Sequence, residues 1–148
     1  MDNEAIQKEL SIACEYCYLH DDWVNPLEDA LAGLSAEEAF RKPKPDATSI
    51  WAIVLHMAVW NENIVERVQT RTKAHPTEGA WPHTPEIPDE AAWQRDKKRL
   101  WDSLESVRSM ITTTTLDDIQ AAPYGIADML CRYIHNGYHI GQITKMRE

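Results

Sequence analysis

Four long stretches of the sequence space their apolar residues as an amphipathic helix does, and no stretch shows the strict alternation of a half-buried strand. We therefore predict an all-α fold, a four-helix bundle in which each stretch forms one helix. The predicted helices cover residues 3–20, residues 48 or 49 to 70, residues 88–112 and residues 124–147.

Two short helices are predicted between the first and second long helices. Asn25 and Pro26 are typical of an N-cap and a first helical position, and Gly33 is typical of the end of such a helix. Ser35-Ala36-Glu37-Glu38 is a capping box that starts a further turn. The two prolines within residues 42–45 are expected to stop it.

The segment between the second and third long helices decides the predicted topology. Residues 73–87 contain three prolines and are expected to be irregular. The second helix would be roughly 35 Å long, and an extended segment of this length reaches roughly 50 Å. A simple helical hairpin needs only a few residues. We therefore predict that the second and third helices are parallel and joined by a long crossover, which gives an up-down-down-up bundle forming one domain over residues 1–148.

Composition excludes several classes of partner. The 148 residues carry a formal net charge of -9, whereas nucleic acids and anionic membrane surfaces require positive patches. No apolar run is long enough to span a bilayer, and the acidic start of the chain does not resemble a signal peptide. We expect no nucleic acid and no membrane as partner.

The three cysteines favour a reducing compartment. Their odd number and spacing give no disulfide pattern, so a cytoplasmic location is expected. Cys14 and Cys17 form a C-x-x-C pair, but it lies inside an amphipathic helical pattern and lacks a second pair that would complete a zinc site. We interpret both thiols as small core residues.

Three histidines have the spacing of a metal site. His56 is the one polar residue in the apolar stretch 50–60, where a buried imidazole needs a hydrogen-bond partner or a metal. His135 and His139 are four residues apart, so their rings project from one helix face and can share an ion at about 2.1 Å. Each signal alone is more often structural, because H-x3-H arises by chance and a lone apolar-face histidine is usually a satisfied core residue. Together they predict a three-histidine site for one divalent metal, and zinc, nickel and iron all accept imidazole.

Segments around these histidines resemble the DinB/YfiT-like superfamily of metal-dependent enzymes. Residues 49–62, which contain His56, are similar to the second helix of that superfamily, and residues 135–143 are similar to its fourth-helix signature. Residues 34–39 and the tripeptide Ala80-Trp81-Pro82 carry weaker similarity. The resemblance covers nearly the whole chain.

The resemblance implies the same up-down-down-up bundle, and it implies His56, His135 and His139 as metal ligands with open positions for water or substrate. Members are often homodimers. Some are thiol-dependent S-transferases or isomerases that use a low-molecular-weight thiol, and others resemble hydrolases. The chain departs from the family pattern in one respect: it shows no additional carboxylate that the motif requires, so the general base is unassigned.

The functional hypothesis is a metal-dependent enzyme acting on a small-molecule substrate. The metal would lower the pKa of a bound water or thiol and so supply a hydroxide or thiolate nucleophile. Two alternatives stay open: a metal-binding protein without catalysis, such as a stress protein, and a dimeric helical bundle that binds partners. A ferritin-like di-iron protein is disfavoured, because its E-x-x-H pairs are absent.

Other residues carry secondary expectations. We expect the hydrogen-bond partners of the histidine rings to be among Gln142, Asn63 and Glu62. His20 is expected at a helix end, with a position facing the site as the alternative. His75 and His83 are expected at the surface, with a gating role as the alternative. Two glycines of the fourth helix indicate close approach of a neighbouring helix, and five tryptophans are expected mainly in the core: Gly137, Gly141, Trp51, Trp60, Trp81, Trp93 and Trp101.

Overall fold

The computed structural model describes residues 2–21 and 25–148, and within them α-helix is the only regular structure apart from turns and bends. The all-α prediction is confirmed. The helices are α1 (Asn3–Tyr16), α2 (Leu27–Leu31), α3 (Ala36–Phe40), α4 (Ile50–Thr70), α5 (Glu90–Thr113), α6 (Leu116–Ala121) and α7 (Gly125–Arg147).

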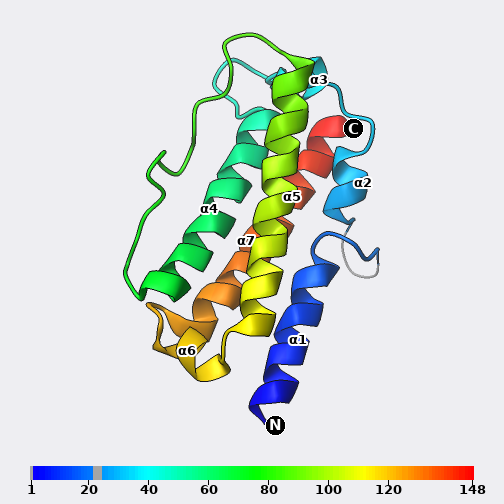
Figure 1. The fold of residues 1–148 in the computed structure, drawn as a ribbon. Helices are drawn as coiled ribbons and strands as arrows, with labels where there is room; N and C mark the ends of the chain where they lie inside the picture. Colours follow the sequence, from blue (N-terminus) through cyan, green and yellow to red (C-terminus); the bar gives the residue numbers. More distant parts are fainter. Residues whose placement is uncertain (1, 22–24) are drawn as a thin grey trace.

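The four longest helices pack side by side (Figure 1). The most extensive contact joins α4 and α5, and further contacts join α4 to α7, α1 to α5 and α1 to α7. Figure 1 shows α4 and α5 running in the same direction, with α1 and α7 running the opposite way. The irregular chain between α4 and α5 returns along the side of α4.

Two buried tryptophans fix one end of the α4–α5 contact. Their rings lie 5.2 Å apart between centroids, and both Trp51 and Trp93 are fully buried. Trp51 Nε1 donates to Asp96 Oδ2 at 2.9 Å, and Trp93 Nε1 donates to the Leu34 carbonyl at 2.8 Å. Each polar edge thus has a partner, which allows the large rings to stay in the core. The core expectation is wrong for Trp81, whose side chain is 49% exposed.

Local signals placed several helix ends correctly. The Ser35 capping box is present in full, and Ser49 caps α4 by accepting from Ala52 N–H at 3.2 Å. Pro26, not Asn25, is the N-cap of α2. The Asn25 side chain donates instead to Thr144 Oγ1 on α7 at 3.1 Å.

Other boundaries differ from the prediction because tertiary contacts override the local pattern. α1 ends at Tyr16 and not at residue 20, since the carbonyl of Tyr18 accepts a hydrogen bond from Glu28 N–H of α2. The short helix α6 was not predicted. Thr115 starts it by accepting from Asp118 N–H at 3.1 Å, and the left-handed Tyr124 (φ 68°) separates it from α7.

The expectation that Gly137 and Gly141 admit a neighbouring helix is wrong for the part of the chain that the structure describes. A methyl group added at either glycine would meet no atom within 4 Å. These glycines lie among exposed apolar residues of α7: Leu130 is 49% exposed, Ile134 73% and Tyr138 62%. We call these five residues the α7 outer stripe.

The described helices include none that is both long and apolar enough to cross a membrane.

The Trp51–Asp96 hydrogen bond yields a stability prediction. The substitution Asp96→Ala leaves a buried indole N–H without an acceptor and is expected to lower the free energy of unfolding by about 2 kcal/mol. Asp102→Ala on the same helix removes only an exposed pair with Lys98 and should cost less than about 0.5 kcal/mol. Urea unfolding followed by circular dichroism measures both, and equal losses would contradict this account.

Candidate metal centre

Helices α4 and α7 bring the three sequence-predicted histidines together. His56 extends from α4, and His135 and His139 extend from successive turns of α7. The Nε2 atom of His135 lies 2.9 Å from Nε2 of His56 and 3.1 Å from Nε2 of His139. The ligand atoms of this triad all lie within 4.8 Å of one another, so the triad could hold one metal ion.

Two of the three rings have acceptors at their outer nitrogens. His56 Nδ1 lies 2.5 Å from the carbonyl oxygen of Ala80, and His139 Nδ1 lies 2.6 Å from Gln142 Oε1. Because an oxygen of this kind only accepts, each Nδ1 carries the proton and each Nε2 keeps its lone pair. Both rings are therefore held with a ligating nitrogen facing the centre of the triad.

The third ring has the opposite partner. Arg132 Nη1 lies 3.2 Å from His135 Nδ1, and a guanidinium only donates. His135 Nδ1 must therefore accept, which puts the proton of a neutral ring on Nε2. That proton points at the lone pairs of His56 and His139, so a single N–H holds the triad together.

Burial keeps the triad neutral. Loss of hydration lowers the pKa of His56, His135 and His139, and it lowers that of His135 to about 3, where the nearby Arg132 charge acts in the same direction. Neutral imidazole is the form that binds transition metals. At neutral pH the triad is thus uncharged, and the Nε2 atoms of His56 and His139 already present lone pairs to its centre.

A model of the DinB superfamily matches residues 19–143, a segment that includes all three histidines of the triad. The chain belongs to the DinB superfamily. The resemblance inferred from the motifs around His56 and His135 is thereby confirmed. Searches of curated proteins and of solved structures gave no match.

Residues 71–89 of this DinB superfamily protein, the irregular chain between α4 and α5 that we call the crossover segment, cover one side of the triad. The Trp81 ring stacks on His56 with centroids 3.8 Å apart and planes 15° apart. Arg99 of α5 ties the segment down by pairing with Glu78 at 2.6 Å and with Glu62 of α4 at 2.7 Å. Main-chain and side-chain atoms of residues 78–81 thus contribute to the site although no histidine of the triad lies there.

Of the three residues predicted as hydrogen-bond partners of the histidine rings, one contacts the triad. Gln142 holds His139, as expected. Glu62 pairs with Arg99 instead, and the buried amide of Asn63 has no hydrogen-bond partner among the described residues. Sequence reasoning missed Ala80, whose contribution is a main-chain atom with no side-chain signal, and Arg132, which its position three residues before His135 could have indicated.

The remaining candidate residues lie outside the triad. His20, His75 and His83 are exposed, and none joins the cluster. Burial raises the pKa of the Cys14 and Cys17 thiols to about 11, and Cys14 Sγ lies 2.6 Å from the Tyr18 hydroxyl. These thiols are unreactive packing residues, in agreement with the interpretation of the sequence.

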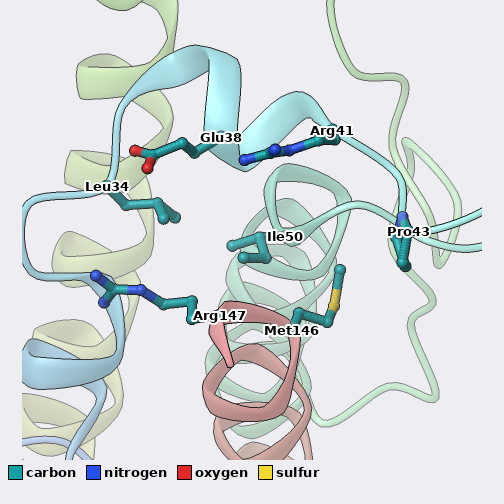
Figure 2. A pocket seen from close by; sticks show the side chains of 7 residues that line it. All are labelled: Leu34, Glu38, Arg41, Pro43, Ile50, Met146 and Arg147. Atoms are coloured by element: carbon teal, nitrogen blue, oxygen red, sulfur yellow. The ribbon is translucent and has the colours of Figure 1, made fainter.

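Two cavities of the DinB superfamily protein lie apart from the triad. One of about 420 Å³ opens between α3 and the C-terminal turn of α7, where Figure 2 shows Arg41 above Ile50 and Met146. Arg147 at its edge already donates to carbonyls of the α2 end. The other, of about 470 Å³, lies beneath the crossover segment beside Arg99. No residue of the triad lines either cavity.

The lowered pKa of His135 predicts acid sensitivity of the metal-free protein. Because the pKa is about 3 in the folded chain and near 6.5 in the unfolded chain, the unfolded state takes up the proton first as the pH falls. Stability from this group is complete above about pH 6.5 and is lost below it. The free energy of unfolding should drop between pH 7 and pH 5 by about 2 kcal/mol more in the parent than in His135→Gln.

Urea unfolding in the presence of a chelator measures this difference. His75→Gln serves as the control, since it removes an exposed histidine of the crossover segment and should leave the pH dependence of the parent. An identical drop in all three proteins would contradict the assignment of a buried, neutral His135.

Proposed function

We propose that this DinB superfamily protein binds one divalent transition metal through the Nε2 atoms of His56, His135 and His139. The observation that carries the proposal is the convergence of three Nε2 atoms, with the outer nitrogens of two rings held by Ala80 and Gln142. A hydrogen-bonded second ring nitrogen is the usual arrangement of a ligating histidine. The donor set fits zinc, nickel or iron equally.

We further propose that the protein is a metal-dependent enzyme, either a thiol-dependent S-transferase or a hydrolase. Three protein ligands leave coordination positions for exogenous molecules, as in catalytic rather than structural sites. A bound metal would supply Lewis acidity, which lowers the pKa of a water or thiol. The exposed part of Trp81 lies next to His56 and is suited to contact a small organic substrate, with a low-molecular-weight thiol as co-substrate.

A metal-binding protein without catalysis is the second candidate. It is favoured by the stacking of Trp81 on His56, which covers one side of the triad, and by the position of the two cavities away from the histidines. A resident ion that no substrate reaches would suit storage or sensing. Access of exogenous ligands to the metal separates the two candidates.

The proposal extends to architecture and assembly. We class the chain as a single-domain up-down-down-up four-helix bundle that works in the cytoplasm as a homodimer. The α7 outer stripe supports the dimer, because uncharged exposed surface along three turns of a helix is typical of an interaction site. Its two glycines leave room for a second helix to approach closely.

Metal content tests the central proposal. Protein prepared without an affinity tag is expected to contain about one equivalent of a transition metal by plasma mass spectrometry, or to take it up on reconstitution. His56→Ala and His135→Ala should each lose it while keeping helicity, because the triad has no spare ligand among the described residues. His83→Ala, which removes an exposed histidine of the crossover segment, is the matched control and should retain the ion.

A parent protein that takes up no zinc, nickel or iron would overturn the metal-binding proposal. Uptake that persists in His135→Ala would place the ion elsewhere.

Assembly is tested by a pair of equally exposed isoleucines. Ile134→Glu inserts a charge into the α7 outer stripe and is expected to convert a dimer to a monomer in sedimentation velocity. Ile87→Glu introduces the same charge at a position that is 71% exposed but lies in the crossover segment, and it should leave the dimer intact. A parent that sediments as a monomer would refute the dimer, and a dimer that survives Ile134→Glu would refute this interface.

A further inference from the structure

A buried arginine without a carboxylate partner lies beside the triad. Arg132 is 7% exposed, and its Nε has no hydrogen-bond partner among the described residues. The nearby carboxylate of Asp128 pairs with Arg67 at 3.0 Å, and none of the described acidic side chains lies within 4.0 Å of Arg132. A buried cation left in this way is costly, since it loses hydration and gains only the attraction of Asp128 beyond ion-pair distance.

The position of Arg132 is fixed although its charge is not neutralised. Its guanidinium lies over the Trp60 ring of α4, 5.2 Å from the centroid. The only hydrogen bond of this side chain within the described part of the chain goes to His135 Nδ1. Its Nη2 makes no hydrogen bond among the described residues and is not fully buried, so it can bind an acceptor that arrives from outside the protein.

Metal binding would remove even that one hydrogen bond. A neutral imidazole that ligates through Nε2 carries its proton on Nδ1. The Nδ1–H of His135 and the N–H of Arg132 would then face each other, and two donors cannot form a hydrogen bond. The contact seen at 3.2 Å is compatible only with the other tautomer of His135. In a metal-loaded protein the guanidinium needs a different acceptor.

We propose that Arg132 binds a carboxylate group of the substrate or thiol co-substrate and so holds that molecule next to the metal. This inference rests on the proposed metal-binding function. The planar guanidinium matches a carboxylate through two parallel hydrogen bonds, and a buried setting strengthens them. Among the described residues, the buried side-chain atoms that lack partners are on Asn63, Arg132 and Asn136, which belong to α4 and α7, the two helices that carry the triad.

The test uses protein loaded with Co²⁺, in which a bound thiolate produces a charge-transfer absorption band. Two probes differ only in charge: 3-mercaptopropionate and its neutral amide, 3-mercaptopropionamide. The parent is expected to bind the carboxylate at least about tenfold more tightly than the amide. Arg132→Gln should lose this preference through weaker binding of the carboxylate alone, and Arg132→Lys should recover part of it.

Arg108→Gln is the matched control, because it makes the same change in net charge at a half-exposed position of α5. It should keep the parent preference. Thermal unfolding and Co²⁺ content are measured on every variant, and Arg132→Gln is expected to fold and load, since it removes an unpaired buried charge.

The outcomes separate the two proposals. A parent that binds no Co²⁺ overturns the metal site and this inference with it. A loaded parent that binds both thiols equally, binds neither at millimolar concentration, or keeps its preference in Arg132→Gln overturns the carboxylate site and leaves the metal site standing. A preference that Arg132→Gln abolishes and Arg108→Gln retains supports it.

Discussion

The contact between α4 and α7 determines what this molecule can do. Each helix alone carries histidines that would be ordinary packing or surface residues, and only their packing brings three Nε2 atoms to one point. The imidazole rings are polar groups in a largely buried place. They are tolerated there because every ring nitrogen has a hydrogen-bond partner. The packing of α4 against α7 therefore both stabilises the fold and forms the histidine triad.

The three histidines of the triad differ in the hydrogen-bond partner of Nδ1, and this difference decides which tautomer each ring adopts. His56 and His139 are held by acceptors in the tautomer that ligates through Nε2, whereas His135 is held by a donor in the other tautomer. The same Arg132 contributes to the low pKa of His135 and lies over Trp60 without a counter-ion. The imidazole tautomer of His135 and the Arg132 guanidinium are therefore coupled, and a metal ion bound at Nε2 would act on both.

The parts of the site that depend on side-chain type and helical periodicity could be predicted from the sequence. The i, i+4 spacing of His135 and His139 and the apolar setting of His56 were sufficient to choose the three histidines, and the caps at Ser35 and Ser49 were read correctly. Contacts that depend on a long irregular segment could not be predicted in this way. Trp81 was expected in the core, but the path of the crossover segment places it on a histidine ring.

Helix ends were missed where a neighbour competes with the local pattern, as at Tyr18. The orientation of His56 depends on the carbonyl of Ala80, an atom that every residue type possesses. Apart from Trp81, which stacks on the ring, side chains along the crossover segment can therefore be exchanged without disturbing the orientation of His56, provided that the main-chain path is kept. The part of the chain that borders the triad can thus change most of its side chains while the three histidines keep their arrangement.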